Sequence, residues 1–253
     1  MKSKKANNLP PIVFIHGAWH GPWSWSNWKS YFEAEGFKTY SVELRGHGNN
    51  KDDYKNARLK DYINDSLTVI DALDNPPILI GHSMGASIVQ GLLQQQTYPA
   101  AVLVAPVPDA KIFKHLLLKG IVTHPLLAIR SLASFDMLPW LKSGNQAEAL
   151  FFSPKMNSKK AHAYASKMQG ESLKVFTLDL DRNNSHTNKT PLLLLAAEND
   201  SFFKVSDQIK TAEMLISDFV LIKNSGHDIM LDASWQVAAE KVCSWIMTKH
   251  QQQ

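Results

Sequence analysis

The chain has 253 residues, of which 44% are hydrophobic and 20% are charged, so it can bury the core of one large α/β domain or two small ones. Its net charge is +4, but the lysines are spread along the chain, which argues against a basic stripe for nucleic acid. No apolar run approaches the ~20 residues that a membrane span needs, and no apolar signal-peptide segment follows the basic start. We therefore expect a cytoplasmic protein without a membrane span or a nucleic-acid partner.

Six short runs rich in β-branched residues or leucine predict buried parallel strands. In chain order they cover residues 12–16, 39–44, 78–81, 101–105, 192–197 and 219–223. Helical spacing of apolar residues falls between several of them, for example from Leu59 to Leu73, and continues after the last one, from Trp235 to Ile246. This alternation predicts an α/β fold with a mostly parallel six-stranded sheet flanked by helices.

One long interval interrupts the alternation, because residues 107–189 carry no convincing strand pattern. A structureless loop of that length is improbable in a compact domain. The interval instead shows helical apolar spacing, for example at Leu126, Ile129 and Leu132. We therefore predict a core made of residues 1–106 and 190–253, with residues 107–189 inserted as a helical cap over the carboxyl ends of the strands.

The third predicted strand runs directly into Gly81-His82-Ser83-Met84-Gly85, and a buried helix pattern follows at once. A Gly-x-Ser-x-Gly turn between a strand and a helix lifts the serine hydroxyl off the end of the sheet. The turn is so tight that only a very small residue fits two positions before and after the serine. Free N–H groups of the following helix lie beneath it. The pattern predicts Ser83 as a nucleophile.

A serine hydroxyl needs a neighbouring base, which in turn needs an orienting acid. His227 is the best-placed base, because it lies in the loop between the last strand and the last helix. Asp200, at the tip of the penultimate strand, is the expected acid. Glu198 lies two residues earlier, and Asp109 follows the fourth strand, so both remain alternatives.

The oxyanion that forms during attack needs two preorganised N–H donors. Met84, the residue after the nucleophile, is expected to supply one of them. The other should come from the turn after the first strand, where Gly17 permits close approach of the backbone. We expect the donor there to be Ala18, with Trp19 as the alternative.

These motifs resemble a small α/β-hydrolase over nearly the whole chain, and specifically the branch of compact esterases and hydroxynitrile lyases. The resemblance rests on His16-Gly17-Ala18-Trp19-His20-Gly21-Pro22-Trp23-Ser24-Trp25, on the serine turn, on Asp200 and on Gly226-His227. Arg45-Gly46-His47-Gly48 also matches a loop that many hydrolases share, which implies a structural role for His47.

Departures from the relatives narrow the expected chemistry. Serine at position 83 differs from the aspartate of dehalogenases and most epoxide hydrolases, which implies acyl transfer. Lyase members carry threonine after the first-strand histidine and lysine after the catalytic histidine, where this chain has Gly17 and Asp228. The resemblance therefore implies hydrolysis and not cyanohydrin cleavage.

We expect a serine hydrolase that cleaves a small to medium carboxylic ester through an acyl-enzyme, without metal or cofactor. A thioester, a lactone or an activated carbon–carbon bond would suit the same residues. A slow-turnover ligand-binding or signalling protein, or an enzyme that uses only the His–Asp pair as base, also remains open. Trp19, Phe135 and Trp140 are candidates for binding substrate, although cap-to-core packing explains the cap aromatics equally well. A homodimer is left open.

Overall fold

A computed structural model describes residues 9–50, 53–108, 110–141, 144–179 and 189–252. Within these residues a six-stranded sheet has the order β2-β1-β3-β4-β5-β6, and all five strand pairings are parallel. The strands are β1 (Ile12–Ile15), β2 (Thr39–Ser41), β3 (Ile78–His82), β4 (Ala101–Val104), β5 (Leu192–Ala197) and β6 (Asp218–Ile222). Each lies in or across a predicted run, so the α/β class and the six-stranded sheet are confirmed.

The four central strands are buried at every residue, whereas the edge strands β2 and β6 are partly exposed. The central strands are continuous apolar runs because helices cover both faces of a parallel sheet and so bury the side chains on both sides. Strand β2 pairs with one side of β1, and the next strand in the chain, β3, pairs with the other side of β1. The carboxyl ends of β1 and β3 therefore lie side by side where the direction of strand order changes, a usual place for a binding site.

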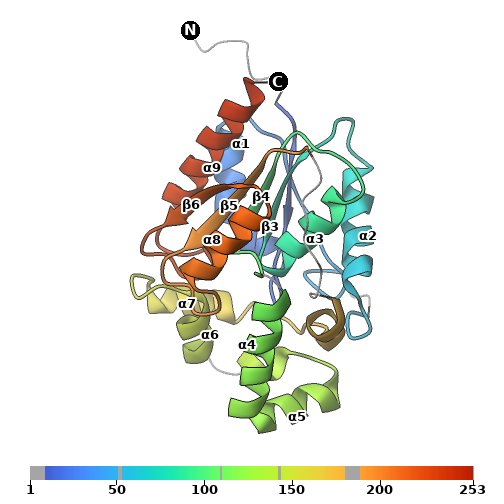
Figure 1. Ribbon diagram of the computed structural model, residues 1–253, viewed down its shortest axis with the longest axis vertical. Helices are drawn as coiled ribbons and strands as arrows, with labels where there is room; N and C mark the ends of the chain where they lie inside the picture. Colours follow the sequence, from blue (N-terminus) through green and yellow to red (C-terminus); the bar gives the residue numbers. More distant parts are fainter. Residues whose placement is uncertain (1–8, 51–52, 109, 142–143, 180–188, 253) are drawn as a thin grey trace.

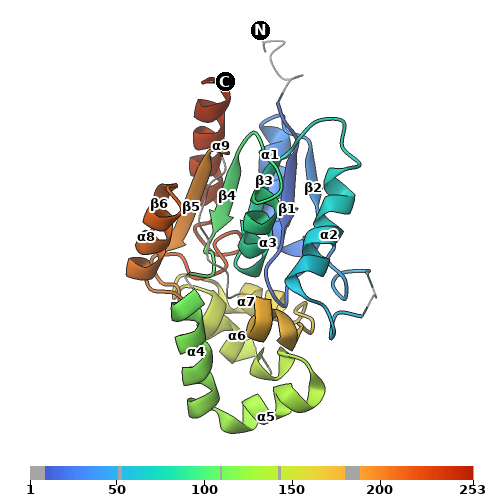
Figure 2. The same cartoon turned by 45° about the vertical axis from the view of Figure 1, so that its right-hand side comes forward.

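Helices α1 (Ser26–Ala34) and α9 (Trp235–His250) cover one face of the sheet, and α2 (Leu59–Ile70), α3 (Met84–Leu93) and α8 (Val205–Met214) cover the other (Figures 1 and 2). A short 3-10 helix (Pro22–Trp25) leads into α1, and its Trp25 stacks on Phe14 of β1 in the core. Among the described helices, none is both long and apolar enough to cross a membrane.

The segment between β4 and β5 carries helices joined by loops, with one isolated bridge between Asp136 and Ser172, and it lies beyond the carboxyl ends of the strands (Figures 1 and 2). Its elements are α4 (Ala110–Thr123), α5 (Pro125–Ser134), a 3-10 turn (Leu138–Leu141), α6 (Gly144–Phe151), α7 (Ser158–Ala165) and a π-helical turn (Val175–Asp179). We keep the name cap for residues 107–189 as a proposal about their role.

Buried carboxyl groups hold the cap segment to the core. Glu171 is fully buried and accepts a hydrogen bond from Tyr62 Oη at 2.5 Å, while His47 Nε2 lies 3.3 Å from its other oxygen. Burial lowers the pKa of His47, but the charge of Glu171, its hydrogen bond and two backbone carbonyl groups together raise this pKa overall. Asp136 similarly accepts from Tyr54 Oη at 2.7 Å. These contacts agree with the structural role expected of His47.

Candidate active site

Ser83 lies on the tight turn between β3 and α3 with φ of 50° and ψ of −115°, a conformation that a residue with a side chain rarely adopts. A Cβ on Gly81 would come within 2.4 Å of the Gly85 carbonyl oxygen, and one on Gly85 within 2.3 Å of the Ile15 carbonyl oxygen. Both distances are too short for a non-bonded contact between a Cβ atom and a backbone oxygen, so positions 81 and 85 require glycine. The surrounding packing thus enforces a strained serine.

The structure brings Ser83, His227 and Asp200 together in one chain of hydrogen bonds. His227 Nε2 lies 3.0 Å from Ser83 Oγ, and His227 Nδ1 lies 2.8 Å from Asp200 Oδ2. The second oxygen of Asp200 accepts from the backbone N–H groups of Phe202 and Phe203, at 2.8 and 3.0 Å. The carboxylate is therefore oriented from both sides, and the imidazole nitrogen facing the serine is placed to accept its proton.

The charges around His227 favour its protonated form. Burial alone would lower its pKa, but the charge of Asp200, its hydrogen bond and the more distant Asp228 together raise the pKa above the ordinary value. His82 has the opposite shift, because burial and the neighbouring His227 hold its pKa well below the usual range. A neutral His82 adds no positive charge beside His227, and its Nε2 lies 3.1 Å from the His227 carbonyl oxygen.

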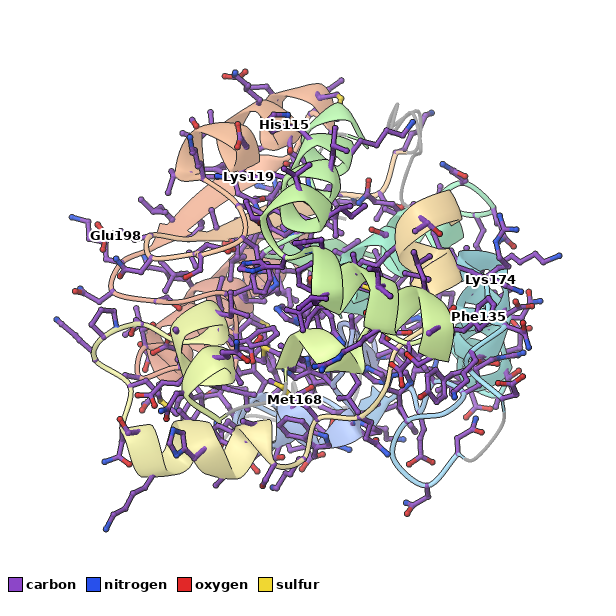
Figure 3. All side chains as sticks on the ribbon, turned by 90° about the horizontal axis from the view of Figure 1, so that it is seen from below. His115, Lys119, Phe135, Met168, Lys174 and Glu198 are labelled. Carbon is purple, nitrogen blue, oxygen red and sulfur yellow. The ribbon has the colours of Figure 1, made fainter. Side chains whose placement is uncertain are left out.

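The other carboxyl groups considered from the sequence do not meet His227 in the described structure. Glu198 is exposed, and it accepts a hydrogen bond from the Asn224 N–H at 2.8 Å. Figure 3 shows its side chain at the edge of the molecule. Asp109 lies outside the described residues. Asp200 is therefore the described carboxylate that contacts the imidazole.

The two predicted N–H donors lie on adjacent backbone segments. Met84 is the first residue of α3, so its N–H has no acceptor within its own helix. A Cβ on Gly17 would lie 2.7 Å from His82 Nδ1 and 3.2 Å from Ser83 Cβ, so the loop after β1 passes directly against the serine turn. Ala18 and Met84 line the same cavity as Ser83. Their role toward an oxyanion remains a prediction.

A buried pair that the sequence analysis missed links this loop to the loop of His227. His20 Nδ1 lies 2.7 Å from the carbonyl oxygen of Ala18, and His20 Nε2 lies 2.9 Å from Asp228 Oδ2. Both side chains are fully buried. Because both ring nitrogens of His20 face oxygens, a proton must lie between His20 and Asp228. Asp228, the residue after His227, is thereby tied to the backbone of Ala18.

His20, His82 and Asp228 also have the composition of a metal site, with ligand atoms within 4.8 Å of one another. However, the imidazole of His20 already bonds Asp228 at 2.9 Å, and that of His82 contacts a backbone carbonyl. These hydrogen bonds account for the arrangement, and we assign it no metal. That the protein needs neither metal nor cofactor stays a prediction.

A mostly apolar cavity of about 490 Å³ opens onto Ser83 and His227. The residues that line it from the cap segment are Val107, Gly120, His124, Leu127, Met137, Trp140, Leu141, Gln146, Ala149, Leu150 and Phe176. Trp19 and Trp140, both expected near substrate, are among the lining residues, and Trp140 Nε1 is held by Ser131 Oγ at 3.0 Å. Phe135 is not brought there: it is 54% exposed and lies at the end of α5 (Figure 3).

A family model described as the alpha/beta hydrolase family matches residues 12–240. The chain belongs to this family. Similar proteins include salicylic acid-binding protein 2 of Nicotiana tabacum, 28% identical over 61% of this chain and 61% of that protein. Methylesterase 4 of Arabidopsis thaliana is 31% identical over 42% of this chain and 43% of that protein. The matched part thus spans less than two thirds of these relatives.

Solved structures show the same fold over almost the whole chain. An extracellular α/β-hydrolase from a Paenibacillus species, described as a structural and functional homologue of the tobacco protein, superimposes with a TM-score of 0.77 at 19% identity, covering 95% of this chain and 98% of that chain. The methylesterase MES16 from Arabidopsis gives a TM-score of 0.70 at 17% identity, covering 93% and 98%. At these identities the likeness concerns the fold.

Proposed function

We propose that this protein is a carboxylic ester hydrolase that works through an acyl-enzyme on Ser83. The observation that supports the proposal most is the chain of hydrogen bonds Ser83–His227–Asp200, of which Ser83 and His227 line an apolar cavity. Family membership supports it, because the chain carries serine where an acyl-transfer hydrolase needs its nucleophile. The location that we predict remains the cytoplasm.

In the proposed mechanism, Ser83 Oγ attacks the ester carbonyl carbon while His227 Nε2 takes the hydroxyl proton. Asp200 holds the imidazole in the tautomer with a free Nε2 and stabilises the imidazolium. The N–H groups of Ala18 and Met84 stabilise the oxyanion. His227 then gives its proton to the leaving alcohol, and a water molecule, deprotonated by the same imidazole, releases the acid and regenerates Ser83.

We propose an ester with an apolar acyl group and a small alcohol as the substrate. The cavity supports the apolar part, because most of its lining side chains are aliphatic or aromatic. The small alcohol follows from the relatives, several of which are named methylesterases. Thioesters, lactones and activated carbon–carbon bonds remain less favoured alternatives, and a slow ligand-binding homologue would have no need of a strained serine.

A panel of matched substrates tests this proposal. We expect the methyl ester of an apolar aryl acid to be hydrolysed faster than the tert-butyl ester of the same acid, and faster than a lactone of similar size. Ser83→Ala supplies the background rate for each compound. Equal rates for the methyl and tert-butyl esters would refute the small-alcohol assignment, and hydrolysis of none of the esters would refute the function itself.

A further inference from the structure

Helix α5 exposes three of its large apolar side chains to water, although Leu127 faces the cavity. Leu126, Ile129 and Leu132 are 72%, 60% and 61% exposed, respectively, while the small residues Ala128 and Ser131 are buried. A surface helix of a water-soluble domain normally buries its large apolar residues and exposes polar ones. The outward face of α5 therefore needs an apolar neighbour.

The exposed apolar surface continues from α5 onto α4 and into the turn after α5. Of the 13 large hydrophobic residues that are exposed in the described part of the chain, eight lie between positions 118 and 138. We call these eight the outer cap face: Leu118, Ile121, Val122, Leu126, Ile129, Leu132, Phe135 and Leu138. Such a concentration marks an interaction surface, since exposed apolar residues are otherwise scattered singly.

The charged side chains in and beside the outer cap face are cationic, except for Asp136, which is buried and accepts a hydrogen bond from Tyr54 Oη. Residues 110–135 contain Lys111, Lys114, Lys119 and Arg130 but no aspartate or glutamate. Lys119 and Arg130 are exposed, and Figure 3 labels Lys119 on α4. A second copy docked on this face by two-fold symmetry would bring cations against cations with no acid from the same stretch to pair them. An anionic surface would instead complement them.

We propose that the outer cap face docks on the surface of an anionic lipid bilayer. Helix α5 lies across the end of the molecule furthest from the termini, so it can rest flat in the headgroup region (Figures 1 and 2). Apolar side chains would then enter the interface while Lys119 and Arg130 contact lipid phosphates. This mode requires no membrane-spanning helix.

Docking on a bilayer would also place the cavity near lipid. Gly120 and His124 of α4 and its connection, together with Leu127 of α5, line the cavity from the same two helices that carry the outer cap face. An apolar ester dissolved in the membrane would thus meet the cavity wall directly. This last consequence rests on the proposed esterase function, whereas membrane docking itself does not.

Co-sedimentation of the full chain with vesicles tests the proposal. We expect binding to vesicles of phosphatidylcholine with phosphatidylglycerol at low salt, weaker binding at high salt, and little binding to phosphatidylcholine alone. Changing Leu126→Ser, Ile129→Ser and Leu132→Ser together should reduce partitioning about tenfold or more. The matched control carries Ile209→Ser, Ile216→Ser and Val237→Ser, three exposed apolar residues outside the face, and should bind as the parent does.

The remaining outcomes separate this proposal from its rivals. Lys119→Glu with Arg130→Glu should also reduce binding to the anionic vesicles. Absence of binding to those vesicles at low salt, or an equal loss in both serine triples, would overturn the proposal. So would a stable dimer that only the α5 triple dissociates, because a second copy would then occupy the face. Hydrolysis of a water-soluble ester, measured in parallel, reports on the proposed function alone, since neither triple touches Ser83 or its partners.

Discussion

The carboxyl edge of the sheet and the cap segment differ in where their polar and apolar side chains lie. At the sheet edge, polar side chains such as His227, His20 and Asp228 are buried and each has a partner within hydrogen-bonding distance. On the cap, large apolar side chains such as Leu126 stand in solvent. Buried hydrogen bonds fix the positions of atoms, whereas an exposed apolar surface favours contact with another apolar surface. We therefore propose that the core loops carry the chemistry and that the cap segment governs selectivity and location.

The largest expected effect comes from removing the nucleophile at the sheet edge. Ser83→Ala should lower kcat/KM by ~10⁴-fold or more, by analogy with other serine triads. Ser201→Ala is a control on the same rim, because its exposed hydroxyl donates to the Ala149 carbonyl and not to Ser83, His227 or Asp200. Steady-state hydrolysis of an activated ester measures both. Similar rates for the two variants would show that the core edge does not carry the chemistry as we describe it.

Removing the charge of the acid should have the next largest effect. Asp200→Asn should reduce kcat by roughly 10³- to 10⁴-fold, because the amide favours the wrong imidazole tautomer. Glu198→Gln and Asp109→Asn are matched controls for which we expect little loss. A larger loss at position 109 than at position 200 would move the acid to the end of β4.

The same variant should shift the pH profile in a defined direction. Hydrolysis needs neutral His227, so activity should fall as pH drops through its pKa, which is raised above the usual value of about 6.5. Asp200 is a main cause of that rise, so the acidic limb of Asp200→Asn should move to lower pH. A limb that moves to higher pH or stays in place would contradict this account.

A smaller effect is expected from the pair that joins the two loops of the site. Asp228→Asn replaces the carboxylate that hydrogen-bonds His20 and so loosens the loop of Ala18, and kcat should therefore fall about tenfold with little change in KM. The free energy of unfolding should fall by about 1–3 kcal/mol, because a buried hydrogen-bonding group loses its charged partner. Asp65→Asn, which breaks the more exposed pair with Arg45, should lower stability without the loss in kcat.

The smallest effects are expected in the cap, and they separate two of its aromatic residues. Trp140 lines the cavity, so Trp140→Ala should raise KM and alter acyl-length preference by about tenfold. Phe135 is mostly exposed and lies outside the lining, so Phe135→Ala should leave relative rates across an ester series unchanged. Rates and melting temperatures are measured on both variants. Unchanged selectivity with lowered stability in Trp140→Ala would mean that this ring only packs the cap.

Local sequence patterns predicted the sheet, and together with the resemblance to α/β-hydrolases they pointed to Ser83, Asp200 and His227, which follow β3, β5 and β6 and lie within hydrogen-bonding distance of one another in the structure. The same reasoning could not find the contact of His20 with Asp228, since 208 positions separate them and only the fold brings them together. The apolar spacing in α5 predicted a helix but not which way its apolar stripe faces. Periodicity identifies a stripe, while the neighbours of the helix decide whether it is covered.

Trapping the acyl-enzyme tests the central claim most directly. The protein is mixed with a short p-nitrophenyl ester, quenched in acid within the first turnovers, digested and analysed by mass spectrometry, while p-nitrophenol release is followed in parallel. We predict a burst of about one equivalent of p-nitrophenol and an acyl group on the peptide that contains Ser83. Steady hydrolysis with no adduct, and the same rate in Ser83→Ala, would contradict an acyl-enzyme on this serine.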